Sequence, residues 1–192
     1  MQWIVNEILK SIKELGANAA NPLRIAIDGR CGAGKTTLAG RLEAELSCAV
    51  FHMDDFFPRP EQRTEERLSI PGENVDHERF LEEVMRPLIQ NRRFCYRPYD
   101  CKTQKLTEPV YAEPKKIAVI EGSYSCHPAL WDFYDLRIFL TVEPREQIRR
   151  IVERNGAEKA EMFKKRWIPL EEKYFAAFDI ENRCELRFST DI

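Results

Sequence analysis

The 192-residue sequence predicts an α/β protein in which helices cover both faces of a parallel sheet. Short apolar runs, typical of strands buried on both faces, alternate with segments of helical periodicity. A glycine-rich motif lies between the first such run and the next helix, which is a position typical of phosphate binding. The length fits a single domain over residues 1–192.

Composition excludes several classes of protein. The 30 basic and 32 acidic residues nearly balance, whereas a nucleic-acid-binding domain is expected to have a pI above about 9. No run of about 18 uncharged apolar residues is present, so we expect no membrane span. The six cysteines form no CxxC pair, which favours free thiols and a cytoplasmic location over a zinc cluster or disulfides.

In the first half of the chain, apolar spacing predicts a docked amphipathic helix within residues 1–20, with one apolar stripe of Trp3, Ile4, Ile8, Ile12 and Leu15. A strand is expected at 23–27, a helix over 38–46 that starts near Lys35, and a second strand at 48–52. A loop rich in proline and glycine follows.

In the second half, Asp76 is a candidate N-cap of a helix over 76–90, and residues 93–112 contain two short β-like runs. Strands are expected at 117–121 and 135–142, and a charged helix at about 144–155. Gly156 then separates this helix from a long helix that ends near 178, and 185–188 is a candidate edge strand.

The motif at 29–36 fits GxxxxGK[ST] at every required position. Its glycines let successive backbone N–H groups turn inward to hold an anion, Lys35 supplies a charge for the β- and γ-phosphates, and the Thr36 hydroxyl can bind Mg²⁺. The predicted nucleotide-binding residues are Gly29, Arg30, Cys31, Gly32, Ala33, Gly34, Lys35, Thr36 and Thr37. The alternative is a chance match in a glycine-rich turn, but the strand and helix around the motif favour phosphate binding.

Carboxylates follow two of the predicted strands. Glu121 ends one strand and is a candidate Mg²⁺ ligand at the crevice of the sheet. Asp54 and Asp55 follow another, and in extended chain only one of them faces the phosphates. Adjacent carboxylates repel unless a cation or an acceptor engages one, so Asp54 is a candidate both for Mg²⁺ binding and for accepting the proton of an attacking hydroxyl.

Basic residues on the following helices are candidates to stabilise the transferred phosphoryl group. Arg154, just before Asn155–Gly156, is the first choice and Arg166 the second, in a lid over about 154–166. The alternative is a solvated basic face that pairs with neighbouring glutamates.

The ordered series GRCGAGKTT, FHMDDFF, NVDH, RPYD, AVIEGSY, DLRIFL and RRIVERN resembles the uridine kinase and phosphoribulokinase group of P-loop kinases, over residues of about 23–178. The resemblance implies a P-loop NTPase of the nucleoside-monophosphate-kinase-like fold, with a five-stranded parallel sheet, flanking helices and a short lid. It also implies an acceptor-binding region over 54–112.

Individual residues match the motifs of that group. The resemblance implies Asp54 as general base, Glu121 as the Mg²⁺-linked glutamate and Arg154 as the lid arginine. It implies acceptor contacts from residues at the matching positions, namely Phe57, Asp76, Tyr99 and Gln104, with Gln104 standing where the group has a histidine that reads the pyrimidine. Arg166 is expected beside the acceptor.

We therefore expect an ATP- and Mg²⁺-dependent kinase that phosphorylates a hydroxyl of a small molecule, most readily a nucleoside, with GTP as an alternative donor. A second hypothesis is a pantothenate-, glycerate- or sugar-phosphate-like acceptor, for which Arg59, Arg63 and Arg67 are candidate ligands. A third is a regulator that binds nucleotide without transferring phosphate. The sequence leaves open a homo-oligomer.

Overall fold

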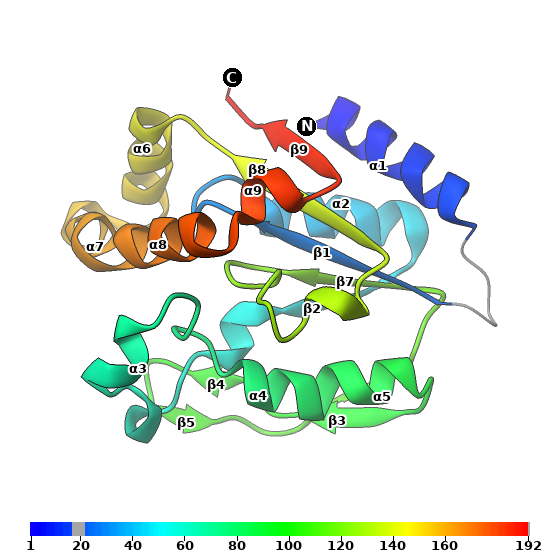
Figure 1. Cartoon of the computed structure of the whole chain (residues 1–192), viewed down its shortest axis with the longest axis horizontal. Coiled ribbons are helices and arrows are strands. Elements are labelled where there is room, and N and C mark those ends of the chain that lie inside the picture. Colours follow the sequence, from blue (N-terminus) through cyan, green and yellow to red (C-terminus); the bar gives the residue numbers. More distant parts are fainter. Residues whose placement is uncertain (17–21, 192) are drawn as a thin grey trace.

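A computed structural model describes residues 1–16 and 22–191, and its centre is a sheet of five parallel strands (Figure 1). The strand order is β2-β7-β1-β8-β9. These strands span Ala49–His52, Ile117–Glu121, Leu23–Gly29, Leu136–Thr141 and Leu186–Ser189, in that order. This arrangement confirms the predicted α/β P-loop fold with five parallel strands.

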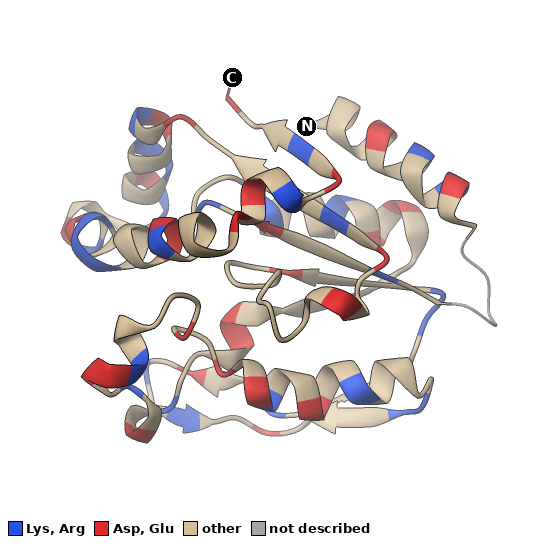
Figure 2. Ribbon diagram, in the orientation of Figure 1, with Lys and Arg blue, Asp and Glu red and all other residues tan. Residues whose placement is uncertain are grey.

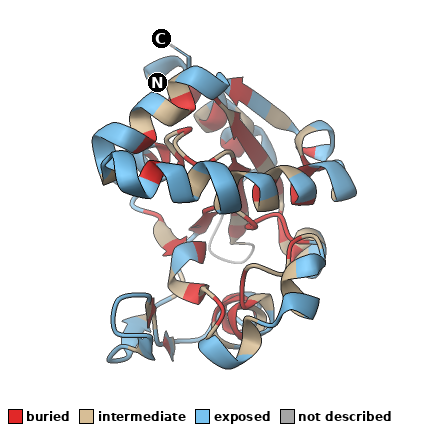
Figure 3. Ribbon diagram, turned by 90° about the vertical axis from the view of Figure 1, so that its left-hand side faces the viewer, coloured by how far each residue is buried: buried red, intermediate tan, exposed pale blue. Residues whose placement is uncertain are grey.

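Helices pack on both faces of the sheet because side chains alternate along each strand. Ile25 and Ile27 of β1 join a core with α1 (Gln2–Leu15) and α2 (Lys35–Leu46). Ala26, between them, faces the opposite core, which contains residues of α4, α5 and α8. The three central strands β7, β1 and β8 are accordingly mostly buried, while the edge strands and the outer sides of the helices are more exposed (Figure 3).

The helices other than α1 and α2 are mostly short. The segment below the sheet runs through α3 (Glu65–Ser69), α4 (His77–Phe80), a π-helical turn (Leu81–Met85) and α5 (Arg86–Ile89). The C-terminal part contains α6 (Pro144–Asn155), α7 (Ala157–Met162), a π-helical turn (Phe163–Trp167), α8 (Ile168–Phe178) and α9 (Ile180–Arg183). Short 3₁₀ turns lie at Met53–Phe56, Pro60–Gln62 and Trp131–Phe133.

The excursion predicted at 93–112 consists of two antiparallel pairs. β3 (Phe94–Tyr96) pairs with β6 (Val110–Ala112), and β4 (Tyr99–Asp100) pairs with β5 (Lys105–Leu106). Both lie with α4 and α5 on the far side of the central sheet from α1 (Figure 1).

The N-terminal helix docks through only part of its predicted apolar stripe. Ile4, Ile8 and Ile12 are buried together with Val5, whereas Trp3 and Leu15 are 55% and 43% exposed. Trp3 packs its edge against Phe188 at the rim of the sheet, so it contacts the protein without being covered. Helix α3 was not predicted, because its five residues show no apolar periodicity. Residues 17–20 of the predicted N-terminal helix lie outside the described residues.

Charges of both signs are distributed over the surface elements (Figure 2). None of the described helices is long and apolar enough to cross a membrane.

Candidate active site

The glycine-rich loop joins β1 to α2 at the carboxyl edge of the sheet. Gly29 has a φ of 128°, and a Cβ there would stand 2.0 Å from the Leu140 carbonyl oxygen of β8. Only glycine permits this conformation and this approach. The loop is thereby held against the sheet with its amides at the start of α2, the arrangement expected for phosphate binding.

The Thr36 hydroxyl and the Glu121 carboxylate meet beside this loop, as predicted. Thr36 Oγ1 donates to Glu121 Oε1 at 3.1 Å, and His52 Nδ1 lies 2.5 Å from the same oxygen. The hydrogen bond to Glu121 raises the pKa of His52 above its ordinary value. His52 was not predicted as a site residue, because only the register of β2 beside β7 brings it to Glu121.

The donor set here fits a hard divalent cation. A hydroxyl from Thr36 and the carboxylates of Glu121 and Asp54 line one cavity, and Mg²⁺ prefers such oxygen ligands together with substrate phosphates. A bound Mg²⁺ would supply charge to neutralise phosphate oxygens.

The buried carboxylate of Asp28 stabilises the loop through hydrogen bonds. Asp28 is fully buried and accepts hydrogen bonds from the backbone N–H of Gly29 (2.7 Å), Tyr124 (3.2 Å) and Cys126 (2.8 Å) and from the Tyr174 hydroxyl (2.9 Å). Burial raises its pKa to about 6. Asp28 thus ties the end of β1 to the segment after β7 and to α8.

The side chains of the loop itself are engaged with the protein. Cys31 is buried against α6, where the Gln147 amide donates to its carbonyl oxygen at 2.9 Å, and burial raises the pKa of its thiol. The Arg30 guanidinium turns away from the loop to Glu172 (2.7 Å) and Glu181 (3.0 Å). Arg30 was predicted to contact nucleotide, but only its backbone belongs to the phosphate-binding loop.

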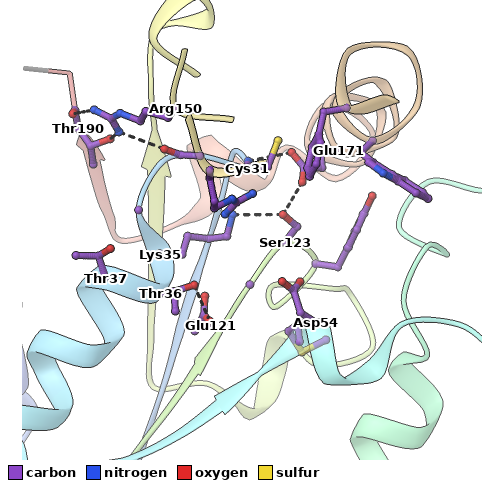
Figure 4. A pocket seen from close by; sticks show the side chains of 18 of the residues that line it. Cys31, Lys35, Thr36, Thr37, Asp54, Glu121, Ser123, Arg150, Glu171 and Thr190 are labelled. Atoms are coloured by element: carbon purple, nitrogen blue, oxygen red, sulfur yellow. Dashed lines mark hydrogen bonds between the residues drawn. The ribbon is translucent and has the colours of Figure 1, made fainter. Parts of the chain in front are cut away.

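One cavity of about 1120 Å³ extends from this loop toward the segment after β2. It exceeds the roughly 300–1,000 Å³ that is typical for one small ligand, so it can accommodate a nucleotide and a second molecule. Lys35, Thr36, Thr37, Arg150 and Thr190 line it on the side of the loop, and Asp54 lines it on the opposite side (Figure 4). Its lining also includes Gly34, Phe57, Arg63, Asn74, Cys101 and Trp167.

Four of the predicted catalytic or acceptor residues from the lid and the 54–112 region line this cavity, and the fourth, Arg154, is described below. Asp54 is exposed to it, while its neighbour Asp55 does not line it. Phe57 packs edge-on against Trp167, with ring centroids 5.6 Å apart. Arg166 lines the cavity and stacks over Trp167 at 4.7 Å.

Three other predicted acceptor residues lie outside the cavity lining. Asp76 is buried and caps α4 through the Arg79 N–H at 3.2 Å. Tyr99 is buried, and its hydroxyl accepts from Arg63 at 2.9 Å. Gln104 is exposed in the turn between β4 and β5 with a φ of 55°. Their contact with an acceptor stays a prediction.

Arg154 lies at the last turn of α6 and lines the cavity. Its Nε donates to Asn155 Oδ1 at 2.8 Å. The guanidinium carbon Cζ lies over the Phe163 ring, 5.9 Å from the ring centroid. The residue is exposed and forms no ion pair with a described carboxylate, so its charge is available to an anion.

A second titratable cluster contains Glu73, His77 and His127, whose ligand atoms lie within 4.8 Å of one another. His127 Nδ1 accepts the Ala129 N–H at 3.2 Å, which places the ring proton on Nε2, the atom nearest Glu73. Glu73 is also paired with Arg67 at 3.0 Å. These contacts fit a neutral histidine in an ion-pair network better than a metal ligand, which would need Nε2 free of its proton.

Comparison with known proteins agrees with this geometry. A family model described as an AAA domain matches residues 25–168. A structure described as a possible uridine kinase from Bacillus stearothermophilus is 24% identical, with a TM-score of 0.69 over 98% of this chain and 100% of the other.

Two further structures share the fold at lower identity. A presumed fructose transport system kinase from Silicibacter is 21% identical, with a TM-score of 0.73 over 96% of this chain and 98% of the other. A D-glycerate 3-kinase from Cryptococcus neoformans is 16% identical, with a TM-score of 0.68 over 99% of this chain and 94% of the other. The expected likeness to uridine kinases and related P-loop kinases is thus confirmed at the level of the fold.

Proposed function

Because the chain belongs to the AAA domain family and has the fold of P-loop kinases, we propose that it is a cytoplasmic, ATP- and Mg²⁺-dependent phosphotransferase. Its acceptor is a hydroxyl of a small molecule, with a nucleoside as the first candidate. One observation carries this proposal: the Asp54 carboxylate and the phosphate-binding loop line the same cavity (Figure 4).

The mechanism follows from the placement of the charged groups. Asp54 accepts the proton of the acceptor hydroxyl as its oxygen attacks the γ-phosphorus. Lys35 and the loop amides bind the phosphates, and Arg154 stabilises the charge on the transferred group. Thr36, Glu121 and Asp54 would hold Mg²⁺.

An acidic acceptor is the second candidate, and Arg63 favours it. Of the three loop arginines, Arg63 alone lines the cavity, whereas Arg59 and Arg67 lie beside carboxylates. Arg63 stacks over Phe57 at 4.6 Å and forms no ion pair with a carboxylate among the residues described. A glycerate-like or phosphorylated acceptor would give it a charged partner.

The test is acceptor-dependent release of ADP from ATP and Mg²⁺ with nucleosides, pantothenate, glycerate and sugar phosphates. We expect one compound to stimulate release, and we expect Lys35→Ala to abolish it. Asp54→Asn should lower kcat by about 10²–10⁴-fold while the ATP Kd stays within about twofold. Asp55→Asn is the matched control, because it removes a neighbouring carboxylate that does not line the cavity.

Slow hydrolysis that no acceptor stimulates, together with tight nucleotide binding, would contradict the kinase and support a nucleotide-binding regulator. Equal losses in Asp54→Asn and Asp55→Asn would contradict the assignment of Asp54 as base.

A further inference from the structure

Helix α8 places a carboxylate on the phosphate-binding loop. Glu171 is only 5% exposed, and its Oε2 accepts the backbone N–H of Cys31 at 3.0 Å. Its Oε1 accepts the Ser123 hydroxyl at 2.6 Å (Figure 4). The carboxylate therefore binds the loop on one side and the segment after β7 on the other.

The loop lysine is joined to the same network. Lys35 Nζ donates to the carbonyl oxygens of Gly29 (2.6 Å) and Arg30 (3.1 Å) and to Ser123 Oγ (3.3 Å). Ser123 thus links the ammonium group to Glu171. The cation expected to meet the phosphates is bonded to the protein's own oxygens.

Glu171 has the charge and the contacts of an anion at this site. A loop amide and a lysine attract negative charge, and the Glu171 carboxylate binds the amide directly and reaches the lysine through the Ser123 hydroxyl. Two anions that share one cavity repel each other, and burial strengthens the repulsion because screening by water is weak there. Glu171 also lines the cavity that contains the loop.

We propose that Glu171 is a built-in competitor for the phosphate-binding loop, an autoinhibitory contact that nucleotide phosphates must displace. The inference rests on the proposed function, since it assumes that the loop binds a nucleotide. Glu171 lies on α8, which continues directly from the π-helical turn that contains Arg166 and Trp167.

The test compares Glu171→Gln with Glu172→Gln by calorimetric titration with Mg·ATP and with inorganic triphosphate. Glutamine keeps the size of the side chain and an oxygen that accepts from Cys31, but it removes the charge. Glu172 is the matched control, because it pairs with Arg30 outside the cavity lining. We expect Glu171→Gln to bind both ligands about tenfold tighter than the natural chain and Glu172→Gln to stay within about twofold of it.

Unchanged or weaker binding by Glu171→Gln would overturn the proposal and would make Glu171 a residue that organises the loop. The thermal transition shows whether Glu171→Gln folds. If it does not fold, the same binding titration is made with Ser123→Ala, because this variant removes one of the two contacts that hold the carboxylate. It should tighten binding in the same direction by a smaller factor, and weaker binding would overturn the proposal.

Failure of the inference and failure of the proposed function give different results. If the natural chain binds Mg·ATP and Glu171→Gln binds it no more tightly, only the inference fails. If no variant binds Mg·ATP or triphosphate, the nucleotide site itself is wrong, and the inference falls with it.

Discussion

Neighbouring acidic residues can differ in role because they differ in surroundings. Asp54 is exposed to the cavity, whereas Asp55 is half-buried and its burial raises its pKa. Alternation along the chain predicted that only one of the two would face the phosphates. The 3₁₀ turn at Met53–Phe56 decides which one, since it presents Asp54 to the cavity.

Tyr124 has a strained backbone conformation. It follows the Glu121–Gly122–Ser123 segment with a φ of 73°, which is strained for a bulky side chain. The Asp28 carboxylate accepts its N–H, so one of the hydrogen bonds described above holds this conformation. Gly122, with a φ of 134°, approaches Met53 so closely that a Cβ would stand 2.8 Å from the Met53 Cβ.

The lowered pKa of buried His127 leads us to predict that the protein loses stability in acid. Burial is the main cause that lowers its pKa, to about 3, with the stacked ring of His77 and Arg67 adding to the effect and Glu78 opposing it. An unfolded chain with a histidine pKa of about 6.5 therefore takes up the proton first, so stability falls as pH drops below about 6.5 toward 3. The expected contribution between pH 7 and pH 5 is about 2 kcal/mol.

The measurement is urea unfolding at these two pH values for the natural chain and for His127→Asn. Asparagine keeps an acceptor near the Nδ1 position but does not titrate. It should lower stability at both pH values and reduce the difference between them by about 2 kcal/mol. An undiminished difference would show that another group controls the acid response.

At the level of secondary structure, α8 connects several parts of the site. Tyr174 donates to Asp28, and Glu171 binds Cys31 and Ser123. A long helix was predicted over this region, but Arg166 was the only residue of it with a predicted role. Its inward-facing polar residues show no distinctive spacing, so no local signal identified them.

The contact from α8 to β1 gives a prediction. Tyr174→Phe leaves the ring in place but removes the hydroxyl that donates to Asp28, a buried acceptor. We expect it to lower the free energy of unfolding by about 1–3 kcal/mol, measured by urea denaturation. Tyr111→Phe, at a position 82% exposed, is the control and should change it by less than about 0.5 kcal/mol. Similar losses of unfolding free energy in the two variants would contradict a stabilising role for the hydrogen bond from Tyr174 to Asp28.

For the molecule as a whole, the two main apolar cores lie on opposite faces of one sheet and share its strands. Neither core can therefore unfold and leave the other intact. We predict a single calorimetric transition in which the calorimetric and van't Hoff enthalpies agree. Two separate transitions would contradict the expectation of one domain over residues 1–192.

The same scan tests nucleotide binding. Mg·ATP at about 100 times its Kd should add about 2.7 kcal/mol of stability and raise the transition temperature. Lys35→Ala should lose this shift, because its ammonium group is the loop cation. A shift that persists in Lys35→Ala would place the nucleotide elsewhere.

Local patterns in the sequence predicted the parallel sheet and the phosphate-binding loop, and they identified Asp54 and Glu121 as candidate carboxylates beside it. These features depend on local signals: apolar periodicity, a motif of fixed spacing, and the ends of consecutive strands. The orientation of Arg30 away from the loop, and the contact of Glu171 with Cys31 across 140 residues of sequence, depend instead on the packing of the folded chain. Contacts at such separations depend on how helices pack over the sheet, which no single stretch of sequence encodes.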